Sequence, residues 1–160
     1  MNIKLEIFFT KLHEDKIVYH RHTLDITGAQ ENPDNIILKL VSDETKETPN
    51  MIDDKFVIHS TSWRFENEGI ILTYLVYSDT VDFSNHETKE LLAKDFIIAK
   101  SENSKKPRPK EISEENVLSH AIRHLGFLIK TDEREKYVSA ISAENIKMLE
   151  QAYPTLAGEI

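Results

Sequence analysis

The sequence predicts an α+β fold in which an antiparallel β-sheet is built around a central hairpin, with the C-terminal helices packed on one face. Three observations support this fold class. Alternating apolar patterns typical of strands begin at residue 3, a hairpin pattern covers residues 55–79, and helical periodicity dominates after residue 113. Strands first and helices last favour the α+β class. A chain of 160 residues is expected to form a single domain, 1–160.

The composition is that of an acidic, globular protein. Apolar residues make up 39% of the chain and charged residues 30%, which suits a soluble folded chain. The apolar runs are far shorter than the roughly 20 residues of a bilayer span. The start, MNIKLEIFF, lacks a secretory signal pattern, so we expect a cytoplasmic protein without membrane partners. The absence of cysteine excludes disulfide scaffolds, thiol catalysis and cysteine-ligated metal sites.

The N-terminal region predicts two strands. In residues 3–9, IKLEIFF, apolar residues alternate with charged ones such as Glu6, as in a half-buried strand. A polar stretch separates this strand from a second one over residues 17–27. Histidines two apart on a strand point to the same face, so His20 and His22 are expected to lie side by side.

The region after residue 28 is harder to assign from its pattern. Asn32 followed by Pro33 is typical of a helix start, with an N-cap and a proline at the first helical position. We therefore expect a helix in residues 35–42, NIILKLVS, although the same run fits a strand. Residues 43–50, DETKETPN, are expected to form a solvated loop.

The hairpin pattern is the clearest in the chain. Residues 55–66 and 70–79 are rich in β-branched and aromatic side chains, and residues 67–69 form a polar turn that contains glycine. Trp63 and Phe65 predict that their side of the first strand is the core face. The second strand is apolar on both faces, which indicates a central strand covered on both sides.

A further strand is expected around residues 96–99, followed by an interruption. Residues 101–112, SENSKKPRPKEI, contain two prolines and the clearest basic cluster of the chain. We interpret them as an exposed loop between the sheet region and the C-terminal helices.

Two helices are expected after this loop. Ser113 is a good N-cap for a helix that continues to Lys130, although the capping box looks incomplete because the third residue on is Asn116. Ser142 is expected to cap a second helix over residues 143–153.

The segment HSTSWR, residues 59–64, is the first candidate site. In a regular strand Ser60, Ser62 and Arg64 share one face, and the length of the turn brings either Tyr77 or Tyr74 beside them. Such a set can bind a carboxylate or phosphate, with the guanidinium as a bidentate hydrogen-bond donor. The alternative is a half-solvated face on which Arg64 pairs with a nearby glutamate.

The main functional hypothesis rests on this polar sheet face. We expect a non-catalytic interaction or small-ligand-binding protein that uses Ser60, Ser62, Arg64 and Tyr77. Its partner would be an unidentified protein or a small anionic ligand, a homo-oligomer such as a homodimer is an option, and no cofactor is expected. No catalytic residue is assigned, because the sequence contains no GxSxG, GxGxxG or P-loop motif.

The histidines support an alternative, a metal-binding protein or metal-dependent hydrolase. His120 and His124 are four residues apart along one border of the predicted helix, and His20 and His22 would complete a set of four nitrogen ligands if the helix crosses that strand. Zinc is the metal expected for such a site. The competing interpretation is that these histidines only mark the border between buried and solvated surface.

A nucleic-acid adaptor is the third hypothesis. It would use the basic residues Lys105, Lys106, Arg108 and Lys110. The formal net charge of −8 argues against it, because binding along phosphates usually needs a positive field.

Overall fold

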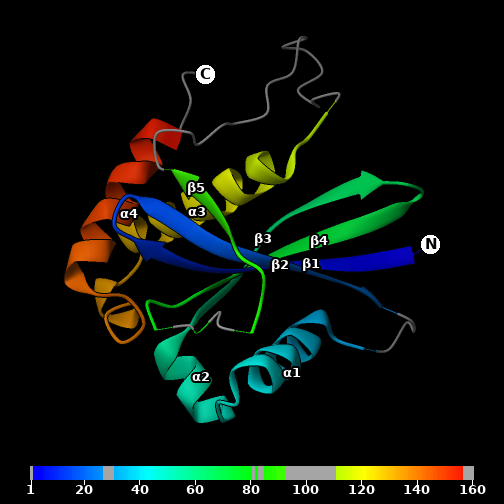
Figure 1. Ribbon diagram of the computed structural model, residues 1–160, viewed down its shortest axis with the longest axis horizontal. Coiled ribbons are helices and arrows are strands. Elements are labelled where there is room, and N and C mark those ends of the chain that lie inside the picture. The colour runs from blue at the N-terminus through cyan, green and yellow to red at the C-terminus, as the bar shows by residue number, and fades with distance from the viewer. Residues whose placement is uncertain (1, 27–30, 81, 83–84, 93–110, 157–160) are drawn as a thin grey trace.

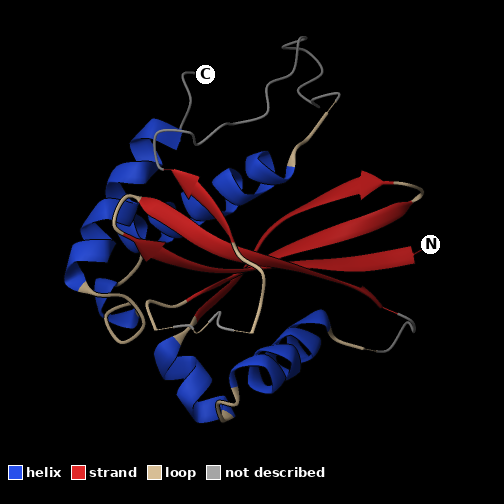
Figure 2. Cartoon of the chain, in the orientation of Figure 1, coloured by secondary structure: helices blue, strands red, loops and turns tan. Residues whose placement is uncertain are grey.

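The computed structural model describes residues 2–26, 31–80, 82, 85–92 and 111–156, and it shows an α+β protein with a five-stranded sheet (Figure 1). The order of strands across the sheet is β3-β4-β1-β2-β5. Helices lie on both sides of this sheet (Figure 2). The elements are β1 (Asn2–His13), β2 (Lys16–Ile26), α1 (Pro33–Thr45), α2 (Pro49–Lys55), β3 (Val57–Glu66), β4 (Gly69–Tyr77), β5 (Lys89–Leu92), α3 (Glu114–Thr131), the short 3₁₀ helix η2 (Arg134–Lys136) and α4 (Ala143–Leu156).

The sheet is mixed, so the prediction of a purely antiparallel sheet is wrong. The β1–β2, β2–β5 and β3–β4 pairs are antiparallel, but β1 and β4 run parallel. The parallel pair arises because two hairpins, β1–β2 and β3–β4, join side by side through strands of the same direction. The predicted hairpin is therefore not central: β3 is an edge strand, and β1 is the middle strand.

The side chains of β1 alternate between two hydrophobic clusters, one on each face of the sheet. Leu5, Ile7 and Phe9 pack with residues of α1 and α2. Phe8 and Leu12 share a cluster with residues of α3 and α4. Since both faces are apolar and covered, β1 is buried through most of its length, not half-buried as its alternation predicts.

Helix α1 begins as the sequence predicts. The Asn32 side chain accepts a hydrogen bond from the Asp34 N–H at 2.9 Å, and Pro33 occupies the first helical position. The helix ends with Lys46 in the left-handed region at φ 59°. A second helix, α2, then begins at Pro49, so the expected solvated loop is shorter than predicted.

The β3–β4 turn consists of two residues, Asn67 and Glu68. Their φ angles are 50° and 61°, the positive values of a type I′ turn, whose twist matches that of a hairpin. Gly69 follows, paired in register with Asn2 of β1. A Cβ atom on Gly69 would lie 2.7 Å from the Asn2 carbonyl oxygen, so glycine allows the two hairpins to meet at this end.

A β-bulge interrupts β3. The register with β4 shifts between Ser60 and Ser62, which leaves Thr61 as the extra residue. Beyond the bulge every side chain of β3 lies on the opposite face from the one that strict alternation predicts. Trp63 is consequently 68% exposed and Phe65 52% exposed, so the prediction that they face the core is wrong.

The C-terminal region begins with a complete capping box. The Ser113 hydroxyl accepts from the Asn116 N–H at 3.2 Å, and the Asn116 side chain accepts from the Ser113 N–H at 2.9 Å. Asparagine thus replaces the usual Glu or Gln. Ser142 caps α4 by accepting from the Asn145 N–H at 3.2 Å.

Two predictions fall largely outside the described residues. These are the strand around residues 96–99 and residues 101–110 of the basic loop. None of the helices that the structure describes combines the length and apolar character needed to cross a membrane.

Candidate functional site

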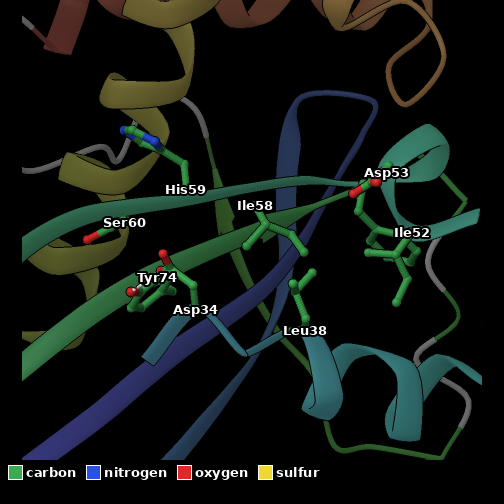
Figure 3. A pocket seen from close by; sticks show the side chains of 9 residues that line it. Asp34, Leu38, Ile52, Asp53, Ile58, His59, Ser60 and Tyr74 are labelled. Carbon is green, nitrogen blue, oxygen red and sulfur yellow. Dashed lines mark hydrogen bonds between the residues drawn. The ribbon is translucent and has the colours of Figure 1, made fainter. Parts of the chain in front are cut away.

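A pocket of about 460 Å³ lies between the two N-terminal helices and the β3–β4 hairpin (Figure 3). Its apolar wall comes from α2 and its C-cap, from α1 and from β3, and its polar groups come from α1, α2, β3 and β4. A few convergent polar groups on an apolar wall are typical of small-ligand sites. The described lining residues are Asp34, Leu38, Ile52, Asp53, Phe56, Ile58, His59, Ser60 and Tyr74.

Three of the polar groups form a hydrogen-bonded chain across three elements, α1, β3 and β4. The Tyr74 hydroxyl donates to Asp34 Oδ1 at 2.7 Å, and the side chain of Ser60 hydrogen-bonds with the same phenol. Burial and the neighbouring Asp34 carboxylate raise the pKa of Tyr74 to about 12. The phenol therefore stays protonated at neutral pH and holds the carboxylate in place at the mouth of the pocket.

The charge of the pocket is negative. Asp34 and Asp53 line it, and no lysine or arginine is among its described lining residues. His59 lies at the rim with its ring turned away from Tyr74 and Asp34 (Figure 3). The pocket can therefore accept hydrogen bonds from a ligand more readily than it can bind an anion.

The bulge separates Ser60 from Ser62 and Arg64, two of the other residues predicted for the polar sheet face. Ser60 pairs with Tyr74 on the α1 face, whereas Ser62 pairs with Thr73 and Arg64 with Ile71 on the opposite face. The buried Tyr77 hydroxyl accepts from the Leu12 N–H at 3.1 Å and donates to Asp79 Oδ1 at 2.9 Å. Of the predicted set only Ser60 lines the pocket, beside Tyr74, which the two-residue turn and the bulge together bring opposite it.

Arg64 is bound to a buried carboxylate. Its Nη1 donates to Glu6 Oε1 at 2.7 Å and its Nη2 donates to Glu6 Oε2 at 3.1 Å, while Arg21 donates to Glu6 Oε2 from the other side. Thr73 completes the group, with its hydroxyl 3.0 Å from Glu6 Oε1. The alternative predicted for Arg64, pairing with a nearby glutamate, therefore holds for Glu66. A second partner, Glu6, lies 58 residues away in sequence.

The ionised form of Glu6 is favoured in the folded protein. The side chain is only 1% exposed, and burial by itself would raise its pKa. Hydrogen bonds and charges from Arg64 and Arg21 outweigh burial and lower the pKa of Glu6 below its ordinary value. With this charge compensated, Arg64 is engaged in the fold and is poorly placed to capture an anionic ligand.

The helix histidines lie against β3. The ring centroids of His120 and His124 are 4.6 Å apart, and the His59 ring is 6.0 Å from that of His124. His120 also hydrogen-bonds with the backbone of Thr61, the extra residue of the bulge. Burial, in first place, lowers the pKa values of all three imidazoles. A second hollow of about 290 Å³ is lined by His120, Arg123, His124 and Phe127.

The strand histidines lie on the other side of the sheet. His20 and His22 alternate with Tyr19, which belongs to the cluster with α3, so both point toward α1. The structure therefore does not bring them together with His120 and His124. Their neighbours are instead Glu44 of α1 and His86, a residue of the segment before β5.

Several residues of these sites were not singled out from the sequence. Asp34 and Glu44 are two among 28 acidic residues, so abundance hides them. His86 lies in a polar segment without periodicity, and only the pairing of β5 with β2 places it beside His20. The sequence signal that could have pointed to His86 is the rarity of histidine, with 7 in the chain.

Comparisons with known proteins bear on the fold alone. No protein-family model matches the chain, and no curated protein matches it. Among solved structures, the crystal structure of NrtR from Shewanella oneidensis is similar, with a TM-score of 0.57. The similarity covers 99% of this chain and 79% of that chain at 10% sequence identity. At this identity the likeness extends to the arrangement of helices and strands and not to function.

Proposed function

We propose that this protein is a non-catalytic binding protein for a small ligand and that the ligand occupies the pocket between α1, α2 and the β3–β4 hairpin. In this proposal the C-terminal helices cover the other face of the sheet, so binding uses the α1 face. The observation that carries the proposal is the Ser60–Tyr74–Asp34 hydrogen-bonded chain beside an apolar wall. This arrangement has the mixture of apolar surface and fixed polar groups that small-ligand sites require.

The chemistry of the pocket favours a ligand with hydrogen-bond donors or a positive charge. Asp34 and Asp53 offer carboxylate acceptors, and the net charge of −8 adds an attractive field for cations. The anionic ligand expected from the sequence has less support, because Arg64 is engaged by Glu6. An amine attached to an aromatic or aliphatic group fits the combination best.

A second candidate function is the binding of a protein partner at a different surface, the exposed edge strand β3. Trp63 and Phe65 are exposed on the edge strand β3. Exposed aromatic side chains and the outer strand of a sheet are both features that protein partners use. A second copy of this chain or a different protein would use that edge without entering the pocket.

The pocket proposal is tested with two probes of the same skeleton and opposite charge, benzylamine and benzoate. In ¹H–¹⁵N NMR spectra of the full chain, benzylamine at roughly millimolar concentration should shift the amide signals of Asp34 and Ser60. Benzoate should leave these signals in place. Asp34→Asn should weaken benzylamine binding about tenfold, because it removes the charge that the amine pairs with.

The matched control is Asp25→Asn, which removes an exposed carboxylate of β2 away from the pocket. This variant should bind benzylamine like the unmodified chain. Stronger shifts with benzoate, or equal binding by Asp34→Asn and the unmodified chain, would refute the proposal.

The metal-dependent alternative stays a separate proposal. It would use His120 and His124, with His59 as a third imidazole on the neighbouring strand. Loss of bound zinc on changing His124 to Ala is its test, and zinc binding that this change leaves unaltered would refute it.

A further inference from the structure

Three segments that are distant in sequence meet at the β2–β5 edge of the sheet, on the face that α1 covers. Alternation along β2 points His20 to this face, the last turn of α1 supplies Glu44, and the segment before β5 supplies His86. The pairing of Tyr19 with Lys89 fixes β5, and with it His86, beside β2. His20 and Glu44 therefore belong to regular secondary structure, and His86 lies three residues before a strand.

The ligand atoms of these residues converge. One nitrogen of each histidine and one carboxylate oxygen of Glu44 all lie within 4.8 Å of one another, the one such group among the described residues. The His86 Nε2 is 2.7 Å from Glu44 Oε2, and the rings of His20 and His86 stack with centroids 4.3 Å apart. All three residues are partly buried, so the group is not a loose surface cluster.

The orientation of the His20 ring suits a metal ligand. Its hydrogen bond with the Glu87 carbonyl uses one ring nitrogen as a donor and leaves the other as an acceptor. A backbone carbonyl on the second nitrogen is the arrangement that orients histidines bound to metals.

We propose that His20, Glu44 and His86 form a zinc site with a fourth position open to water. Two imidazoles and one carboxylate are a donor set that zinc accepts, at about 2.0–2.2 Å for each ligand atom. Tetrahedral coordination would bring the ligand atoms about 3.3 Å apart, which small side-chain rotations achieve from the present separations. Magnesium and calcium prefer oxygen donors, so the two nitrogens select against them.

Binding of zinc replaces the hydrogen bond between His86 and Glu44. The neutral His86 ring then carries its single proton on Nδ1, which frees the Nε2 lone pair for the metal. The Glu44 carboxylate turns to the same ion, and one metal ion links β2, α1 and the segment before β5. His22, whose Nδ1 is 3.9 Å from Glu44 Oε1, flanks the carboxylate. The site lies at the opposite end of α1 from Asp34, so it is separate from the ligand pocket.

The experiment titrates ZnCl₂ into the chelator-treated full chain by calorimetry and then measures zinc that co-elutes with the protein in gel filtration. The expected result is one zinc ion per chain and a higher thermal unfolding midpoint, because the ion binds the folded form. Glu44→Gln and His86→Ala should each weaken zinc binding by about tenfold or more. An excess of MgCl₂ should not displace the zinc.

The control variant is His13→Ala, which removes an exposed histidine at the end of β1 that belongs to neither histidine cluster. It should bind zinc with unchanged affinity. The proposal is overturned if the unmodified chain binds no zinc, or if His124→Ala abolishes binding while Glu44→Gln does not. Glu44→Gln preserves the shape of the side chain, and its circular dichroism spectrum without zinc checks that loss of binding is not loss of folding.

Discussion

Glu6 is buried in the middle strand, and arginines from both sides of it compensate its charge. Arg21 comes from the adjacent strand β2, and Arg64 reaches across β4 from the edge strand β3. Burying a lone carboxylate is costly, and removing one partner of a buried ion pair exposes that cost. The residue with the strongest ligand-binding chemistry in the sequence, Arg64, is therefore used to hold three strands together.

Arg64→Ala is expected to destabilise the fold. The loss should be about 3 kcal/mol of unfolding free energy, because Glu6 loses two hydrogen bonds and its better-buried cation. Arg21→Ala should cost less, about 1–2 kcal/mol, since Arg64 still neutralises the carboxylate. Urea denaturation at neutral pH measures both values.

The control for this pair is Arg134→Ala, which breaks an exposed ion pair with Glu150. Exposed pairs contribute up to about 1 kcal/mol. If Arg64→Ala cost no more than Arg134→Ala, the buried ion pair would not be a stabilising feature of the fold.

At the scale of elements, one inserted residue in β3 decides what the strand presents. Thr61 is the extra residue, and from Ser62 onward the side chains exchange faces. The exchange turns Trp63 outward and brings Arg64 over Glu6. His120 of α3 forms a hydrogen bond with the backbone of Thr61 at the bulge. This contact gives one of the two helix histidines a structural role.

The exposure of Trp63 gives a direct test of the bulge. It is the single tryptophan of the chain, so the fluorescence emission reports on it alone. With 68% of the side chain exposed, the emission of the folded protein should resemble that of the unfolded protein and should be quenched readily by iodide. A blue-shifted, protected emission in dilute solution would contradict the bulge. A blue shift that appears only as the protein concentration rises would indicate association through β3.

For the whole molecule, the partly buried histidines and Glu6 have the same effect on pH dependence: their contributions to the unfolding free energy decrease as the pH falls. The pKa values of His59, His120 and His124 are lowered on folding, so below about pH 6.5 the unfolded chain binds protons first. The pKa of Glu6 is also lowered, so its contribution is present above about pH 4.5 and is lost as the pH falls further. Arg123, which adds positive charge beside the helix histidines, strengthens the first effect.

The unfolding free energy should therefore fall continuously from about pH 7 to about pH 4, in two stages. Urea denaturation across this range measures it. A double variant, His120→Gln with His124→Gln, should flatten the upper stage, and Glu6→Gln should flatten the lower one. Higher stability at pH 5.5 than at about pH 7 would show that the signs are wrong.

Local patterns in the sequence determined most of the elements. Alternation identified β1, β2 and the β3–β4 hairpin, and capping residues identified the starts of α1, α3 and α4. These features depend on neighbours within a few residues, through side-chain direction and backbone hydrogen bonding, so they can be predicted from the sequence. The same reasoning placed His20 and His22 together, and the structure keeps them on one face.

Only the tertiary structure decided how the elements combine. The parallel pairing of β1 with β4 joins two hairpins that are separated by two helices, and no local pattern encodes it. The bulge at Thr61, the burial of Glu6 and the arrival of Glu44 and His86 beside His20 all follow from packing between distant segments. The sequence by itself determined which side chains can do chemistry, and long-range packing decided which of them meet, because each site is made of residues whose separation in sequence far exceeds the reach of local interactions.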